Sequence, residues 1–389
     1  MLCTKKIAVI ASFVILALIF IMYNSSSNSP EARRSDEIPC IIYTSPEIEN
    51  RHDTLGPSEI QGSYESEDFV PNQILIYTKY YGSEWNDIFT GEPLFKNNRC
   101  TYTTDPSDLK RSPLVLFHLR DVTKDSHLPT MKVPNQKWVV YNIESPIVNR
   151  KYDAYSFYKK ISHQFDIAMT YRLDADIPIP YGSVERRVNS TEVTGEINFK
   201  EKSKMIAWFV SNCNSLSKRE IVVKKMRRLI PIDVYGHCGS LKCPIVDERT
   251  YKNESCYEML SKSYKFYLAF ENSICVDYVT EKLYNILNYD IIPIVYGGAN
   301  YSNLLPYNSY IDVMNFTSPE KLVNYLQYVG SNESVYKSYF HWRKDFQVVS
   351  RFPDKLCDFL LNNESMAAVT KRNFFDWWFQ DSCRETTIW

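Results

Sequence analysis

Apolar residues fall in runs of strand length, and polar segments compatible with helices separate the runs. A first series is ILIYTKYY (74–81), PLVLFHL (113–119), KWVVYNI (137–143) and FDIAMTY (165–171). A second series is KMIAWFV (204–210), IDVYG (232–236), KFYLAF (265–270), DIIPIVY (290–296) and SYIDVM (309–314). Continuous apolar runs are typical of parallel strands that helices cover on both faces. The pattern therefore predicts parallel sheets in an α/β fold.

The polar stretch 183–203 separates the two series and has the composition of a linker. A chain of 389 residues is long enough to bury two cores. We therefore expect two doubly wound, Rossmann-like domains that face a cleft. Ligands of such sheets bind at the carboxyl ends of the strands, so the residues that follow each run are the first candidates for chemistry.

The N-terminus carries one long apolar run, IAVIASFVILALIFIMY (7–23), preceded by Lys5 and Lys6. Its length and positive flank predict a transmembrane signal-anchor helix, with residues 1–6 cytoplasmic and the rest of the chain lumenal. A cleaved signal peptide is the alternative, but its apolar core is usually shorter and ends at a small-residue site. Residues 24–72 are rich in Ser, Pro, Glu and Asp, which predicts a stem.

If the chain after the anchor lies in the lumen, its cysteines can form disulfides and its glycosylation sequons can be used. Of ten cysteines, Cys3 would be cytoplasmic, and an odd number would remain in an oxidising compartment, where several should pair. Spacing allows a short Cys238–Cys243 loop and a tether from Cys100 to Cys357 or Cys383, without deciding among them. Besides Asn24, which would abut the membrane, Asn-x-Ser/Thr triplets begin at Asn189, Asn253, Asn300, Asn315, Asn332 and Asn363.

Charge and motifs exclude several classes of protein. The chain has 45 basic and 46 acidic residues, so its formal net charge of -1 gives no electrostatic argument for nucleic acid. It has no GxGxxG, GxxxxGK[ST], HExxH or GxSxG motif, which disfavours dehydrogenases, P-loop kinases, zincins and α/β-hydrolases. It also has no CxxC pair, which disfavours a structural zinc site.

The densest cluster of reactive side chains follows the run KFYLAF. Glu271 and Asn272 come directly after the run, and we expect Asp277 to cap the next helix. Helical spacing would place four polar residues on one face of that helix: Tyr278, Glu281, Lys282 and Asn285. A lysine near a helix N-terminus suits a phosphate, and a carboxylate suits sugar hydroxyls. The same spacing also fits an ordinary amphipathic helix with solvated charges.

Three further groups follow predicted strands. Arg219 lies beyond KMIAWFV and could hold a diphosphate, although the position taken alone favours a surface arginine. Glu144 ends the run KWVVYNI and is placed to act as a general base if it lies in the cleft. Asp174-x-Asp176 resembles a metal-binding pattern, but it lies in the other half of the chain from Arg219 and Lys282, so we favour a structural role.

Taken together, these motifs resemble the α1,3-fucosyltransferases, the Lewis-type and core-type Golgi family. The resemblance is carried by FYLAFENSICVDYVTEKLYNIL (266–287) and IIPIVYGGANYSNLLPYNSYIDVMNF (291–316). It extends to WFVSNCNSLSKRE, DVYGHCG, YRLDADIPIPYG and WVVYNIESP, and it covers roughly residues 73–360 in family order.

The resemblance implies a GT-B fold and the transfer of fucose from GDP-fucose, with inversion, to the 3-hydroxyl of an N-acetylglucosamine. It implies a Golgi membrane protein with one span and a lumenal catalytic part. It implies an N-terminal acceptor-side domain (73–195), a GDP-fucose-binding domain (196–355) and a C-terminal segment (356–389). It implies that Glu144 is the general base, that Arg219 and Lys282 neutralise the diphosphate, and that Glu271, Asn272, Tyr278 and Glu281 contact the donor.

The resemblance further implies that no metal cofactor is essential, because Arg219 and Lys282 replace it, so Mg²⁺ or Mn²⁺ should at most stimulate activity. The Gly297-Gly298 pair departs from the family pattern, in which a bulkier residue often follows the first glycine. Two alternatives stay open at this point: a membrane-anchored glycan-binding protein without turnover, and an inverting glycosyltransferase that uses another nucleotide sugar. The acceptor, which could be core GlcNAc, LacNAc or LacdiNAc, is undetermined.

Overall fold

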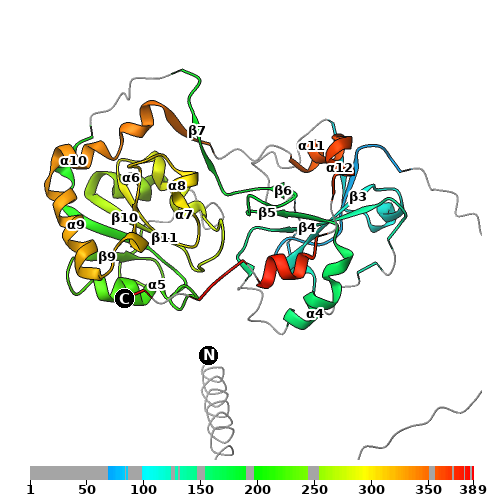
Figure 1. Ribbon diagram of the computed structural model, residues 1–389, viewed down its shortest axis with the longest axis horizontal. Helices are drawn as coiled ribbons and strands as arrows, with labels where there is room; N and C mark the ends of the chain where they lie inside the picture. Colours follow the sequence, from blue (N-terminus) through cyan, green and yellow to red (C-terminus); the bar gives the residue numbers. More distant parts are fainter. Residues whose placement is uncertain are drawn as a thin grey trace, which may run out of the picture. The chain divides into compact units, whose positions relative to one another are not determined.

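The computed structural model describes most of the chain after residue 68 (Figure 1). The described residues are 69–83, 85, 99–123, 128–129, 132–146, 154–189, 197–243, 254–349, 355–369, 372–380, 382–385 and 388–389. The expected cytoplasmic tail, the signal-anchor at 7–23 and the stem up to residue 68 lie outside them. No helix among the described residues is both long enough and apolar enough to cross a membrane.

A six-stranded sheet forms from the first series of apolar runs. Its strand order is β2-β1-β3-β4-β5-β6, and every neighbouring pair is parallel. The strands are β1 (Gln73–Ile76), β2 (Thr101–Thr103), β3 (Leu114–His118), β4 (Lys137–Asn142), β5 (Ile167–Thr170) and β6 (Ile177–Pro178). All residues of β1, β3 and β5 are buried, as the continuous apolar runs predict.

A five-stranded sheet forms from the second series. Its strand order is β12-β11-β10-β8-β9, and all its pairs are parallel as well. The strands are β8 (Lys204–Phe209), β9 (Ile232–Tyr235), β10 (Tyr264–Phe270), β11 (Ile292–Tyr296) and β12 (Ile311–Asp312). The protein is therefore an α/β protein built on parallel sheets.

Helices cover both faces of the second sheet (Figure 1). One face packs against α5 (Arg219–Met226) and α9 (Pro319–Ser331). The other face packs against α6 (Glu254–Ser263), α7 (Glu281–Tyr284) and α8 (Tyr301–Leu304). Helix α9 begins where the Ser318 hydroxyl accepts a hydrogen bond from the Lys321 amide, with Pro319 in the first turn.

The end of the chain covers the first sheet. One face of this sheet packs against α4 (Ala154–Ile161) and against Phe374, Phe375, Trp378 and Phe379, the last two within a π-helical turn, Asp376–Gln380. The opposite face packs against Leu356 and Cys357 of α11 (Lys355–Leu361). Two further short α-helices lie among the described residues: α10 (Glu333–Ser338) and α12 (Asn363–Ala367). The segments 355–369 and 372–380 therefore contribute side chains to the core of the first sheet.

The stretch 183–203 is not only a linker, which corrects the prediction from its composition. Ser183–Arg186 form strand β7, which pairs antiparallel with β13 (Phe346–Val349). The pattern hides this strand because its residues are partly or fully exposed and two of them are charged. Apolar side chains from both strands, Val184, Phe346 and Val348, pack against the second sheet's core.

Four disulfides join the described cysteines: Cys100–Cys357, Cys213–Cys238, Cys243–Cys256 and Cys275–Cys383. The tether from Cys100 to Cys357 is confirmed. The short Cys238–Cys243 loop and the pairing of Cys100 with Cys383 are wrong, because each of these cysteines has another partner. Cys3 and Cys40 lie outside the described residues.

Candidate active site

The strand order of the second sheet places the site between β8 and β10. From β8 the chain moves to β9 on one side, and it then returns to β10 on the other side. The connections therefore diverge at the carboxyl ends of β8 and β10, where open α/β sheets bind ligands. Arg219 begins α5, which follows β8, and Glu271 directly follows β10. The structure thus brings together two residues that the sequence predicted separately.

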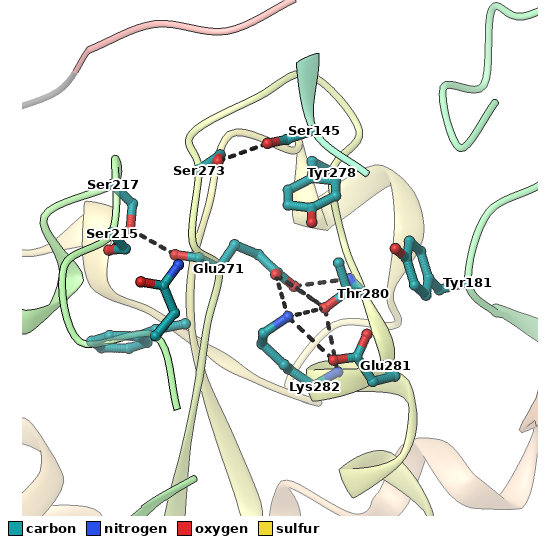
Figure 2. A network of polar contacts seen from close by, with 12 residues as sticks. Ser145, Tyr181, Ser215, Ser217, Glu271, Ser273, Tyr278, Thr280, Glu281 and Lys282 are labelled. Carbon is teal, nitrogen blue, oxygen red and sulfur yellow. Dashed lines mark hydrogen bonds and ion pairs between the residues drawn. The ribbon is translucent and has the colours of Figure 1, made fainter. Parts of the chain in front are cut away.

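Glu271 is the buried centre of a polar network (Figure 2). Its carboxylate has no exposed surface and accepts hydrogen bonds from the amide and the hydroxyl of Thr280, at 2.8 and 3.0 Å. The ammonium of Lys282 lies 3.2 Å from Glu271 Oε2 and 3.2 Å from Glu281 Oε1, and it donates to the Thr280 hydroxyl at 2.7 Å. One ammonium thus stands between two carboxylates.

Burial and this pairing set the protonation of the network. Burial raises the pKa of Glu271 against the opposing effect of the Lys282 ammonium. Burial alone would lower the pKa of Lys282, but the carboxylates of Glu271 and Glu281 outweigh it, and the pKa rises. Lys282 is therefore a cation at neutral pH, and it is held in place at the end of the strand.

The helix that carries Lys282 starts later than the sequence predicted. Thr280 caps α7, which begins at Glu281, so Tyr278 precedes the helix and does not share its face. Asp277 is not the cap: it has φ 56°, and its carboxylate accepts a hydrogen bond from the Leu173 amide at 3.1 Å. The Thr-Glu pair at the start of the helix was a usable signal, because threonine is a preferred N-cap residue. Sequence reasoning missed it.

Arg219 is buried rather than exposed, with 3% of its surface accessible. Its guanidinium donates to the carbonyl of Phe270 at 2.5 Å and to that of Asn212 at 3.4 Å. Burial lowers its pKa against the opposing effect of Glu271. A surface arginine is therefore not the explanation for this position.

Three buried polar atoms near Glu271 have no hydrogen-bond partner in the part of the chain that the structure describes: Arg219 Nε, Asn272 Oδ1 and Tyr301 OH. Buried polar atoms left unpaired cost about 1–3 kcal/mol each. Such a group is expected where a polar ligand supplies the partners. Tyr301 was not predicted from the sequence. Its hydroxyl lies where a side chain on Gly297 would stand, 2.3 Å from that position.

The surroundings of Gly298 explain why glycine stands at this position. A Cβ atom at this residue would lie 2.5–2.7 Å from the backbone of Cys275. The loop after β10 therefore passes directly against Gly298, and a bulkier residue would displace it. The Cys275–Cys383 disulfide and a hydrogen bond from the Val276 amide to the Ser382 carbonyl (2.7 Å) hold that loop in place.

Glu144, from the first half of the chain, meets this loop. Its carboxylate accepts a hydrogen bond from the hydroxyl of Tyr278 at 3.3 Å, and the hydroxyls of Ser145 and Ser273 are 2.8 Å apart. Figure 2 shows the Ser145–Ser273 contact above the ring of Tyr278, whose hydroxyl points toward the cluster around Glu271. Tyr278 is fully buried against Tyr171, and Tyr171 in turn contacts Trp378. Sequence reasoning missed the serine pair.

Asp174 and Asp176 have structural partners, in agreement with the preferred interpretation. Asp174 pairs with Arg172 at 2.8 Å and accepts from the indole of Trp377 at 3.0 Å. Asp176 accepts from the Ala168 amide at 2.7 Å. Among the described residues, no group of three or more His, Cys, Asp or Glu is arranged to hold a metal ion.

The sequons differ in accessibility. Asn189, Asn300 and Asn315 are exposed. Asn332 is half-buried, and its side-chain oxygen caps α10 by accepting from the Val335 amide at 3.2 Å. Asn363 is the first residue of α12, and Asn253 lies outside the described residues.

Comparison with known proteins identifies the family. Residues 70–182 match the description "Fucosyltransferase, N-terminal", and residues 199–376 match "Glycosyltransferase family 10 (fucosyltransferase) C-term". The chain is 32% identical to alpha-(1,3)-fucosyltransferase C of Drosophila melanogaster over 84% of this chain and 81% of that protein. It is 34% identical to 4-galactosyl-N-acetylglucosaminide 3-alpha-L-fucosyltransferase 9 of Rattus norvegicus over 79% of this chain and 83% of that protein.

The fold is similar to that of a solved α1,3-fucosyltransferase crystallised with GDP. The TM-score is 0.50 at 19% identity, over 78% of this chain and 93% of that chain. Both halves of the sequence and the fold thus lead to one conclusion: the chain belongs to the family 10 fucosyltransferases, the α1,3-fucosyltransferase family.

Proposed function

We propose that this protein transfers L-fucose from GDP-fucose, with inversion, to the 3-hydroxyl of N-acetylglucosamine in glycans. The family and the names of its relatives support the reaction type. We further propose a GT-B arrangement, in which the first-sheet half binds the acceptor and the second-sheet half binds the donor.

One contact carries this proposal: the hydrogen bond between Tyr278 and Glu144. Tyr278 belongs to the loop that also carries Glu271 and leads into Lys282, whereas Glu144 follows a strand of the first sheet. The candidate base and the candidate anion-binding groups therefore meet at one place. A glycosyl transfer needs both, because a proton must leave the attacking hydroxyl while negative charge builds on the departing diphosphate.

The reaction would be a single displacement. Glu144 would accept the proton of the acceptor 3-hydroxyl as its oxygen bonds to the anomeric carbon of fucose. The bond from that carbon to the diphosphate oxygen would break, and GDP would leave with both electrons. The cations of Lys282 and Arg219 would balance the charge on GDP. Because the attacking and leaving oxygens lie on opposite faces of the sugar, the configuration inverts.

The other donor residues divide by exposure. We assign direct donor contacts to the partly exposed Asn272 and Glu281, and we place the contribution of the buried Tyr278 in its hydrogen bond to Glu144. Glu271 has no exposed surface, so we place its contribution to donor binding in holding Lys282. Since two protein cations serve the diphosphate, we propose that no metal is essential and that Mg²⁺ or Mn²⁺ at most stimulates activity. Activity that persists in EDTA would support this.

The test compares the full-length protein with Glu144→Gln, with GDP-fucose as the donor. The acceptors are glycans that end in LacNAc, glycans that end in LacdiNAc, and chitobiose-core glycopeptides. We expect wild type to form an α1,3 linkage, identified by mass spectrometry and linkage-specific fucosidases. Glu144→Gln should lose about 10²–10⁴-fold in turnover, the usual contribution of a general base, while GDP still binds. GDP binding without transfer to any acceptor would instead favour a glycan-binding protein.

We also propose a single-pass Golgi membrane protein with its catalytic part in the lumen. Supporting observations are the apolar run 7–23 with its two preceding lysines, the exposed sequons and the disulfides. Digestion with N-glycosidase and immunofluorescence of the full-length chain in cells test this directly.

A further inference from the structure

A concavity of about 540 Å³ lies at the edge of the second sheet where the amino ends of its strands meet. Two strands and the segment before β9 line one side of it, with Met205 of β8, Lys265 of β10, Ile230 and Pro231. The last turns of α9 line the other side, with Gln327, Tyr328, Gly330 and Ser331. The candidate active site lies at the carboxyl ends of the same strands, so the concavity is separate from the proposed donor and acceptor sites.

The lining combines an exposed aromatic ring with neutral polar groups and one ammonium. The ring of Tyr328 is 55% exposed. The ammonium of Lys265 donates to the Gly330 carbonyl at 2.5 Å and lies 4.6 Å from the centre of the Phe199 ring. None of the lining residues that the structure describes is acidic. An aromatic face beside hydrogen-bonding groups suits a sugar, which has an apolar face and a rim of hydroxyls.

The chain can supply a sugar at this place itself, through the sequon that begins at Asn332. Asn332 directly follows Ser331 at the junction where α9 ends and α10 begins (Figure 1). It lies four positions after Tyr328. Residues four apart along a helix share one face, and helical side chains tilt toward the N-terminus. A group attached to Asn332 is therefore placed beside the ring of Tyr328 and the rim of the concavity.

The side chain of Asn332 uses its oxygen and leaves its nitrogen available. Oδ1 accepts hydrogen bonds from the Val335 amide at 3.2 Å and from the Ser334 hydroxyl at 2.9 Å. Nδ2 donates to no group in the part of the chain that the structure describes, and it is not among the buried atoms that lack a partner. Nδ2 therefore reaches the surface, and it is the atom that N-glycosylation modifies. Capping of α10 and modification use different atoms, so both can hold at once.

We propose that Asn332 carries an N-linked glycan whose first N-acetylglucosamine packs on Tyr328 and covers the concavity. The modification joins Asn332 Nδ2, which loses one proton, to the anomeric carbon of that sugar. The bond from this carbon to the diphosphate of a lipid-linked oligosaccharide breaks, and the lipid diphosphate leaves with both electrons. The glycosylation machinery of the secretory pathway supplies this donor, so the inference rests on the proposed lumenal location. It adds which sequon is occupied and what its glycan does for the fold.

Occupancy is measured on the full-length protein, expressed in cells that keep N-glycans in the high-mannose form. N-glycosidase in heavy-oxygen water converts each occupied asparagine to a labelled aspartate, which mass spectrometry of peptides locates. We expect the label at Asn332 in most molecules. If other sequons are labelled and Asn332 is not, the lumenal location stands and the glycan at Asn332 is wrong. If no sequon is labelled, the lumenal location and the glycan at Asn332 both fail.

Two variants remove the glycan in different ways. Asn332→Asp keeps an oxygen that can cap α10, and Ser334→Ala removes the sequon while Asn332 stays in place. Each should lower Tm by about 2–4 °C, because the ring of Tyr328 loses its cover. Ser334→Thr retains the sequon and should keep the Tm of wild type. GDP affinity should stay at the wild-type value in all three variants, because the concavity lies at the opposite edge of the sheet from the candidate site.

An endoglycosidase that leaves only the first N-acetylglucosamine tests which sugar makes the contact. Wild type trimmed in this way should keep its Tm, because the sugar on Tyr328 is still present. A fall in Tm on trimming that equals the fall in Asn332→Asp would overturn the assignment of the contact to the first sugar.

Tyr328→Ala combined with Asn332→Asp tests the contact itself. We expect Tyr328→Ala to lower Tm in the glycosylated protein and to have at most about half of that effect in the Asn332→Asp background, since residues in contact are coupled. Tyr81→Ala is the matched control: Tyr81 is 45% exposed but belongs to the half of the chain that forms the first sheet. Its effect should be equal in both backgrounds. Equal effects of Tyr328→Ala in the two backgrounds would show that the glycan does not pack on this ring, even with Asn332 occupied.

Discussion

Lys282 shows how a single residue links the stability of the site to its chemistry. Its ammonium is shared between the buried carboxylate of Glu271 and the half-exposed carboxylate of Glu281. Removing one partner of a buried ion pair is costly, because the remaining charge has no compensation. The ammonium of Lys282 is therefore held beside the carboxyl end of β10 before any ligand binds. Such preorganisation is what stabilises developing charge during catalysis.

A second buried lysine, Lys202, makes stability depend on pH. Its ammonium donates to the carbonyls of Ser261 and Asp290, and burial lowers its pKa from 10.5 to about 8. Between these values the unfolded chain holds a proton that the folded protein has released, so the free energy of unfolding rises with pH. Lys202→Met should remove this rise.

Urea unfolding at pH 7, 8.5 and 10 checks this. We expect the stability of wild type relative to Lys202→Met to increase by up to about 3 kcal/mol from pH 8 to pH 10.5, at 1.36 kcal/mol for each pKa unit. Taking the difference between the two proteins cancels other groups that titrate in the same range. A difference that stays flat or falls with pH would contradict the lowered pKa.

At the scale of elements, each of the nine predicted runs contains a strand, whereas short or polar strands outside the runs were missed. β11 and residues 266–270 of β10 are buried on both faces, so their sequences are continuously apolar. β2 and β7 have no fully buried residue, and β6 has two residues, so none of them leaves a pattern. The helix after Glu271 was predicted three residues too early, because an acidic residue at 277 satisfied the same capping rule as Thr280.

Thr280 joins the start of α7 to the candidate site. Its hydroxyl caps the helix and also donates to Glu271, so Thr280→Val should remove both contacts without changing side-chain shape. We expect a loss of about 1 kcal/mol in stability and at least a threefold weaker affinity for GDP. Urea unfolding and titration calorimetry measure the two effects.

Ser318→Ala is the matched control, because Ser318 caps α9 and contacts none of the candidate site residues. It should cost a similar free energy of unfolding and leave GDP affinity unchanged. Equal effects of the two substitutions on GDP affinity would show that Thr280 matters only as a helix cap.

At the scale of the whole molecule, contacts between distant parts of the chain complete the site. Glu144 and Tyr278 are 134 positions apart, and Cys275 and Cys383 are 108 apart. No periodicity in a single sequence encodes such pairs, which is why the disulfides were only partly predicted and the serine contact was missed. The candidate site residues could be proposed from the sequence because several strand ends carried polar groups and matched a family pattern.

The Cys275–Cys383 disulfide should matter for donor binding, and the Cys100–Cys357 disulfide should not. The first anchors the loop that carries Glu271 and Tyr278, whereas the second joins α11 to the region before β2. Replacing both cysteines of either pair by alanine should cost about 2–5 kcal/mol in stability. Only the Cys275/Cys383 pair of substitutions should weaken GDP binding, by at least fivefold in calorimetry.

Both double variants must be compared at a temperature where each is folded, as judged by circular dichroism. If GDP binds equally well to the Cys275→Ala/Cys383→Ala protein, the loop is held by its other contacts, such as the Val276–Ser382 hydrogen bond.

The origin of the first sheet's core residues also affects the order in which the two halves of the chain can fold during synthesis. The sheet's strands lie within residues 73–178, but Leu356, Phe374, Trp378 and Phe379, which cover its two faces, follow them by more than 170 residues. The strands of this sheet are therefore synthesised long before the residues that cover them. The buried core of the second sheet uses residues 197–342, all made before Leu356, so this half can close first. Until those covering residues are synthesised, apolar surface of the first sheet stays exposed, and such surface favours aggregation. The half that is translated first should thus be the half that folds last.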